Sequence, residues 1–219
     1  MEKVTLGILE FPPHSRIDEV TNECLGGFIS ITEQILAEYD LAVDVICAPP
    51  IRIYRMLNNG EVDFTINIKS TEALPKDVIF VETPLSTLKL ELYSNNSIKS
   101  MRSIAAIRGF GYHGFRTTLI EQGYDFIDLP TSISAIKLFL KERSSHLISY
   151  RSPVDYYIKE KQLNINSDTS TKLLTTVPTY YAISAQSLHN KKLKSAFDDY
   201  ASKHSLLFFD QVIPEKVIK

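Results

Sequence analysis

The apolar positions of the chain alternate between two spacings, one typical of helices and one typical of strands. Residues 51–57 place apolar side chains at helical spacing behind the pair Pro49-Pro50, and Asn59-Gly60 supplies a left-handed stop. Residues 62–68 then alternate apolar and polar side chains, as a β-strand does. The stretch therefore predicts a proline corner, a short helix and a strand.

The same unit recurs later in the chain. Residues 130–150 again begin with a proline, continue with apolar positions at helical spacing between residues 133 and 140, and end in the apolar pair Leu147-Ile148. Two copies of one helix–strand unit in a chain of 219 residues predict an α/β protein with two similar halves.

The remaining segments fit the same alternation of strands and helices, which predicts βαβ units and mainly parallel sheets. Further strands are expected at residues 4–11, 43–47, 78–81, 88–93, 104–107, 126–129 and 179–184, and further helices at residues 26–39, 115–120, 153–161 and 189–203. Polar loops are expected at residues 14–25, 69–76 and 164–171, and the apolar tail 206–214 is expected to pack on the body of the protein.

Composition excludes two classes of partner. The formal net charge is −2 and the isoelectric point is near 6.2, whereas a nucleic-acid-binding protein needs a basic face. No run approaches the roughly 18 apolar residues of a membrane span, so direct membrane insertion is not expected. Cys24 and Cys47 are too few for a metal framework; one bridge between them and two inert thiols both remain open.

Five short segments in order resemble motifs of the bacterial extracellular solute-binding proteins of the amino-acid-binding type. They are Phe11-Pro12-Pro13, Gly26-Gly27-Phe28, the segment 57–63 ending in Asp63, the segment 78–84 ending in Pro84, and the segment 106–112. Glu82-Thr83 stands in the fourth segment where the family usually has one residue. The resemblance spans nearly the whole chain.

The resemblance implies a two-lobed type II periplasmic-binding-protein-like fold, in which each lobe has a central, mainly parallel sheet flanked by helices. Lobe one would comprise residues 1–93 and 184–219, lobe two residues 94–183, and two hinge strands would join them. A small ligand would bind between the lobes, at the carboxyl ends of the strands. The family further implies a monomer in the periplasm that serves an ABC-type transporter permease or a receptor. The chain begins directly with a strand, so a cytosolic protein and a periplasmic protein whose leader has been removed are both open; we expect the latter.

The chain departs from the family where amino-acid-binding members hold their ligand. The loop 67–75 lacks the arginine that holds the α-carboxylate, and Arg151 or Tyr150 stands where an aspartate holds the α-ammonium group. We therefore expect a small polar or anionic ligand rather than an ordinary α-amino acid. The candidate ligand-binding residues are Phe11, Arg52, Tyr54, Asn67, Lys69, Ser70, Arg108, Tyr112 and Arg151.

Several of these candidates also have a purely structural interpretation. Arg52 could form a surface pair with Glu61 or Asp63, Arg151 could cap a helix in solvent, and Lys69 could belong to a polar surface loop. The glycines after Arg108 could serve turn geometry alone or lead to an anion site at the next helix. Asp63 is expected to tie its strand to a neighbouring backbone amide, and Tyr180-Tyr181 to pack in the hinge.

Catalytic patterns are absent from the sequence. The five histidines show no metal-ligand spacing, Gly109-x-Gly111 lacks the rest of a dinucleotide motif, and no nucleophile elbow or Walker loop occurs. No catalytic residue, metal or cofactor is therefore expected; His113 is the best acid–base candidate. Beside a transport protein, two alternatives remain: an enzyme on the same fold, such as a dehydratase, and the ligand-sensing domain of a membrane sensor protein.

Overall fold

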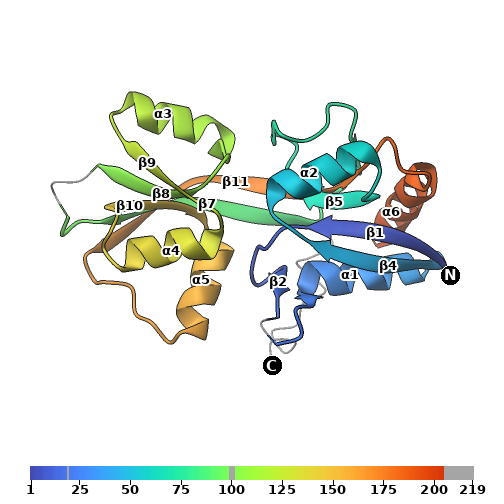
Figure 1. Ribbon diagram of the computed structural model, residues 1–219, viewed down its shortest axis with the longest axis horizontal. Coiled ribbons are helices and arrows are strands. Elements are labelled where there is room, and N and C mark those ends of the chain that lie inside the picture. Colours follow the sequence, from blue (N-terminus) through green and yellow to red (C-terminus); the bar gives the residue numbers. More distant parts are fainter. Residues whose placement is uncertain (19, 99–101, 205–219) are drawn as a thin grey trace. The chain divides into compact units, whose positions relative to one another are not determined.

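The computed structural model describes residues 1–18, 20–98 and 102–204 (Figure 1). The chain forms two compact units. Unit 1 comprises Met1–Thr87 and the described residues from Pro178 onward, and unit 2 comprises Leu88–Val177. Strands β7 (Ser86–Asn95) and β11 (Thr169–Ile183) contribute residues to both units.

Unit 1 contains a mixed sheet in the order β4, β1, β5, β11. Its first three strands are β4 (Leu41–Cys47), β1 (Glu2–Ile8) and β5 (Phe64–Asn67). β1 runs parallel to both β4 and β5, whereas β11 runs antiparallel to β5 and to the short β6 (Ile79–Phe80). Three parallel neighbours therefore bring their carboxyl ends to one edge of this sheet.

Helices cover both faces of this sheet. Helices α1 (Gly27–Ala37) and α6 (Asn190–His204) pack in one apolar cluster with β1, β5 and β11, where the rings of Tyr181 and Phe197 stack at 3.9 Å. Helix α2 (Pro50–Asn59) packs in a second cluster, and Figure 1 shows α1 and α2 on opposite sides of the strands. Gly7 of β1 has no room for a side chain, because a Cβ atom would lie 2.7 Å from Val62.

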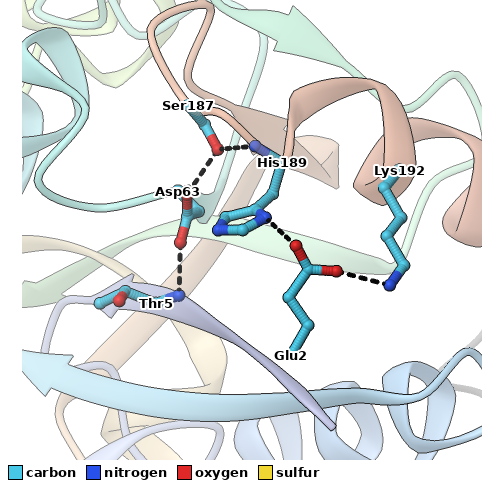
Figure 2. Close-up of polar contacts among 6 residues, drawn as sticks. All are labelled: Glu2, Thr5, Asp63, Ser187, His189 and Lys192. Carbon is cyan, nitrogen blue, oxygen red and sulfur yellow. Dashed lines mark hydrogen bonds and ion pairs between the residues drawn. The ribbon is translucent and has the colours of Figure 1, made fainter.

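The proline corner predicted at residues 49–68 is confirmed. Helix α2 begins after Pro49, with Pro50 at its first position, and ends at Gly60 in the left-handed conformation with φ 72°. The following Asp63 accepts the backbone N–H of Thr5 at 2.7 Å and also the hydroxyl of Ser187 (Figure 2). The predicted structural role of Asp63 is therefore confirmed.

Unit 2 has the strand order β11, β7, β10, β8, β9. β8 (Ser103–Ile107) runs parallel to β10 (His146–Tyr150) and β9 (Asp125–Leu129), and β7 is antiparallel to β10. Helices α4 (Ser132–Leu140) and α5 (Arg151–Glu160) pack together in its apolar cluster, and α3 (Phe115–Glu121) lies on the other side of the strands in Figure 1. α4 is the second proline-corner helix, begun by a capping box between Thr131 and Ser134.

Two predicted loops are partly wrong. β11 is 15 residues long, so it already begins within the loop predicted at residues 164–171 and continues through Pro178. Pairing with β5 starts only at Tyr180, so the missing N–H of Pro178 interrupts no bond of that ladder. Residues 14–25 contain a small hairpin of β2 (Arg16–Ile17) and β3 (Cys24–Leu25). The predicted packing of the tail 206–214 lies outside the described residues.

Cys24 and Cys47 form a disulfide bond across 23 positions of sequence, which decides between the two interpretations that the sequence left open. The bond joins β3 of the hairpin to the last residue of β4. The hairpin is thereby fixed to the carboxyl-terminal edge of the unit 1 sheet.

Candidate ligand-binding site

The sheet topology brings most unit 1 candidates to one edge. Phe11 follows β1, Arg52 lies in the first turn of α2 after β4, and Asn67 is the last residue of β5. These strands are parallel neighbours, so all three residues belong to the carboxyl-terminal edge. This is the edge at which open α/β sheets bind ligands.

Asn67 and Tyr54 form a buried polar pair. The Asn67 amide donates to the Tyr54 hydroxyl at 2.9 Å, and its carbonyl oxygen accepts the backbone N–H of Ile68 and the hydroxyl of Thr71. Burial raises the pKa of Tyr54, so the hydroxyl stays protonated. Both side chains are more than nine-tenths buried, so they shape the edge from inside the unit, and their ligand contacts remain predictions.

Lys69 lies in an ion pair with Glu82 at 2.8 Å, and its ammonium group lies 4.6 Å from the centre of the Tyr180 ring. The hydrogen bond from Lys69 lowers the pKa of Glu82. Both members are exposed, so the pair contributes little to stability. The charge of Lys69 is nevertheless partly balanced, which weakens it as an anion-binding group.

Phe11 belongs to an aromatic stack that the sequence analysis did not identify. His14 stacks between Phe11, at 5.9 Å, and Phe28, at 4.6 Å between ring centres. Burial lowers the pKa of His14 to about 4, so the imidazole is neutral at pH 7. The only signal in the sequence was the spacing of three ring-bearing residues around Pro12-Pro13 and Gly26-Gly27. Phe11 itself is 7% exposed.

Arg52 and Ser70 are exposed. Among the described residues, the guanidinium of Arg52 forms neither of the surface pairs considered from the sequence, and Asp63 is bound to Thr5 and Ser187 instead. Arg52 is exposed at the edge where Asn67 ends β5, and its contact with a ligand remains a prediction.

Unit 2 places two arginines at the ends of neighbouring parallel strands. Arg108 follows β8 and Arg151 follows β10, and these strands pair in parallel, so both residues lie at one edge. The side chain of Arg108 is exposed, and its backbone N–H donates to Leu129. Gly109 after it has φ 77°, which supports the turn-geometry interpretation of this glycine.

The segment after Arg108 does not lead directly into a helix, as the anion-site interpretation required. Helix α3 begins only at Phe115, after a 3₁₀ turn at Tyr112–Gly114 in which Tyr112 and His113 have positive φ angles. The Tyr112 hydroxyl accepts the backbone N–H of Ile107 at 2.7 Å, and burial raises the pKa of Tyr112. The buried ring supports the end of β8, and its contact with a ligand remains a prediction.

Arg151 is held by Glu91, a residue that the sequence analysis missed. The Nε atom of Arg151 donates to Glu91 Oε1 at 2.9 Å, Nη2 donates to the same oxygen, and the Tyr93 hydroxyl donates to Oε2 at 2.7 Å. Glu91 is 1% exposed, whereas the Arg151 side chain is 46% exposed. Arg151 is therefore anchored from within the unit and is not a solvent-facing helix cap.

At the opposite edge of the unit 1 sheet, Asp63, Ser187 and His189 lie close together but are not arranged as a Ser–His–Asp triad. Ser187 donates its hydroxyl to Asp63 and accepts the backbone N–H of His189, while the His189 ring lies 2.9 Å from Glu2 (Figure 2). The imidazole therefore does not activate the serine. Among the described residues, no group of three or more His, Cys, Asp or Glu side chains could hold a metal ion, and no helix is long and apolar enough to cross a membrane.

No protein-family model and no curated protein sequence matches the chain. Solved structures are similar to it over nearly its whole length. A histidine kinase sensor domain with similarity to periplasmic binding proteins has a TM-score of 0.73 at 17% identity, covering 94% of this chain and 92% of that one. An ancestral arginine-binding protein bound to arginine has a TM-score of 0.73 at 15% identity and 96% coverage of both chains.

A third similar structure is an ABC uptake transporter substrate-binding protein from Streptococcus pneumoniae with bound histidine. Its TM-score is 0.72 at 15% identity, and the match covers 95% of this chain and 87% of that one. The chain therefore has the type II periplasmic-binding-protein fold, as its sequence motifs predicted.

Proposed function

We propose that the chain is a non-catalytic binding protein that takes up one small polar or anionic solute at the carboxyl-terminal edges of its sheets. The observation that carries this proposal is the fold, which is shared along nine-tenths of the chain with ligand-binding proteins. In this proposal the strands that both units share, β7 and β11, bend as the units close on the solute.

The residues at these edges support a ligand other than an ordinary α-amino acid. Loop 67–75 has no arginine for an α-carboxylate, and its one lysine, Lys69, is paired with Glu82. Arg151 or Tyr150 stands where an aspartate would hold an α-ammonium group; neither supplies a negative charge there, and a guanidinium would repel the group. Titration calorimetry with the twenty common α-amino acids should therefore show no heat of binding; a micromolar affinity for any of them would contradict this ligand class.

The proposal is tested by identifying the solute. Native mass spectrometry of the purified protein, followed by a thermal-shift screen of polar metabolites, should give at least one ligand that raises the melting temperature. Arg52→Ala should weaken its binding, while Arg55→Ala, on the same helix and also exposed, should not. An equal loss of affinity in both variants would contradict the proposed site. The absence of any ligand in the screen would contradict the proposed function. Turnover of the ligand would favour an enzyme instead.

The similar sensor domain favours a second candidate, a ligand-sensing domain of a membrane sensor protein. A transmembrane segment and a signalling domain in the same open reading frame would support sensing, and a neighbouring gene for a membrane permease would support transport. For transport the partner would be a membrane permease, whereas for sensing the membrane segment would belong to the same protein. We propose that the chain acts as a monomer, which analytical ultracentrifugation would test.

We further propose a location outside the cytoplasm. The disulfide between Cys24 and Cys47 supports it, because such bonds persist in oxidising compartments and are rare in the cytosol. Fractionation of the source cells, with alkylation of free thiols before lysis, tests both the location of the protein and the presence of the disulfide. Alkylated Cys24 and Cys47 in a cytosolic fraction would contradict this location.

A further inference from the structure

The contact between Arg151 and Glu91 leaves one side of the guanidinium available. Arg151 uses its Nε hydrogen and one Nη2 hydrogen on Glu91 Oε1. The remaining Nη2 hydrogen and the Nη1 group form the outer edge of the planar fork, and among the described residues nothing accepts a hydrogen bond from Nη1. Two parallel N–H groups on such an edge match the two oxygens of a carboxylate.

Glu91 fixes the direction of this outer edge. Its carboxylate is buried to 1% exposure, and its second oxygen is held by Tyr93. A flexible arginine loses rotational freedom when it binds a ligand, whereas an arginine already held in place loses less. Arg151 is the first residue of α5, directly after β10, so the fixed edge belongs to the carboxyl-terminal end of the unit 2 sheet.

The local charges select the kind of anion. Glu91 balances the charge of Arg151, so a dianionic group such as phosphate would be poorly compensated by this pair. A carboxylate carries one negative charge, and the exposed Arg108 on the neighbouring strand end can balance it. We infer that Glu91 is a positioning residue that presents the outer edge of Arg151 to a carboxylate group of the ligand. This inference rests on the proposed function and adds the ligand's chemical class.

A competing interpretation is that Glu91 and Arg151 form an ion pair that only stabilises unit 2. The two interpretations predict opposite effects of removing the Glu91 charge on anion binding. If Glu91 only stabilises unit 2, loss of a negative charge near an anion site should tighten anion binding by Coulomb's law, whereas loss of a positioning residue should weaken it. Asp155 lies one helical turn after Arg151, interacts with it electrostatically, and is exposed. Asp155→Asn is therefore the matched control for Glu91→Gln, since both remove one negative charge beside Arg151.

The experiment titrates acetate, succinate, citrate and benzoate, with succinamide as the neutral control, into the wild-type protein by calorimetry. At least one carboxylate should bind, and Glu91→Gln should weaken it about tenfold, a change of about 1.4 kcal/mol. Asp155→Asn should leave its affinity unchanged or tighten it. Arg151→Ala should abolish binding, whereas Arg143→Ala, on an exposed arginine before β10, should not.

Tyr93→Phe gives a second, milder test if Glu91→Gln does not fold. It keeps the carboxylate but removes the hydroxyl that holds Oε2, and it should weaken binding about threefold, by analogy with the loss of one hydrogen bond. In nitrogen-15 spectra, the Nε–H signal of Arg151 should be sharp in the wild type and broadened in Glu91→Gln. An effect on melting temperature without an effect on affinity would make the pair purely structural and overturn the inference.

Different results would contradict the carboxylate inference and the binding function. If the metabolite screen finds only cationic or neutral ligands, or inorganic phosphate alone, the carboxylate inference is overturned while the binding function stands. Tighter carboxylate binding by both Glu91→Gln and Asp155→Asn would also overturn it. If no ligand of any class binds, the proposed function itself fails.

Discussion

The side-chain amide of Asn67 donates a hydrogen bond to the hydroxyl of Tyr54 at 2.9 Å, inside unit 1 at the carboxyl-terminal end of β5. Because both side chains are buried, removing the hydroxyl leaves the amide without an acceptor. Tyr54→Phe should therefore lower the free energy of unfolding by about 1–3 kcal/mol, measured by urea denaturation. Tyr180→Phe, at a partly buried ring, should change it by less than about 0.5 kcal/mol. Equal effects would show that the bond to Asn67 is not important.

Asp63 joins three segments of unit 1, through Thr5 of β1 and Ser187 before α6. Asp63→Asn replaces one acceptor by a donor that faces an N–H or O–H group, so we expect a loss of about 1–3 kcal/mol in unfolding free energy. Asp44→Asn, which breaks an exposed ion pair with Lys3, should cost less than about 1 kcal/mol. A small effect at Asp63 would contradict its structural role.

The disulfide should stabilise the protein mainly by restricting the unfolded chain. It closes a loop with a sequence separation of 23, for which chain entropy predicts about 3 kcal/mol. The double substitution Cys24→Ser with Cys47→Ser should lower the unfolding free energy by roughly that amount. Wild-type protein treated with reductant should show the same loss, and an unchanged denaturation midpoint in both samples would contradict it.

Acid should destabilise unit 1 through His14. Its pKa is about 4 in the folded protein and about 6.5 when unfolded, so between these values the unfolded state binds more protons. The contribution of neutral His14 to the free energy of unfolding is fully present above pH 6.5. It decreases as the pH is lowered towards 4, by up to roughly 3 kcal/mol. His14→Phe keeps a ring between Phe11 and Phe28 and should flatten the pH dependence of unfolding between pH 7 and 4. An unchanged slope would exclude His14 as the cause.

Features set by neighbouring residues could be predicted from the sequence. The proline corners and the helix end at Gly60 depend on residues within a few positions of each other. The hydrogen bond of Asp63 depends on one carboxylate beside a strand. The positions of Arg108 and Arg151 at strand ends also followed from the alternation of strands and helices. Arg52, Asn67 and Phe11 reached the expected edge for the same reason.

Features that depend on distant partners were missed. A regular alternation over residues 88–93 would place Glu91 on the same face as Lys89, but the buried side of β7 changes after Leu90, so Glu91 and Tyr93 are buried. The length of β11 was hidden because its first half is polar and partly exposed, and Pro178 suggested a break. Tyr181, expected in the hinge, lies instead in the core of unit 1 against Phe197. Local periodicity carries no information about which face a remote helix covers.

The insertion of unit 2 within unit 1 sets an order for folding on the ribosome. Strand β5 emerges early, but its antiparallel partner, the segment Tyr180–Ile183 of β11, is translated only after the whole of unit 2. The nascent chain therefore exposes one side of β5 while the helices and strands of unit 2 become complete. A chaperone that binds exposed strands would meet this chain at β5. A circular permutant that starts at residue 178 would synthesise the segment Tyr180–Ile183 before β5 and remove that interval.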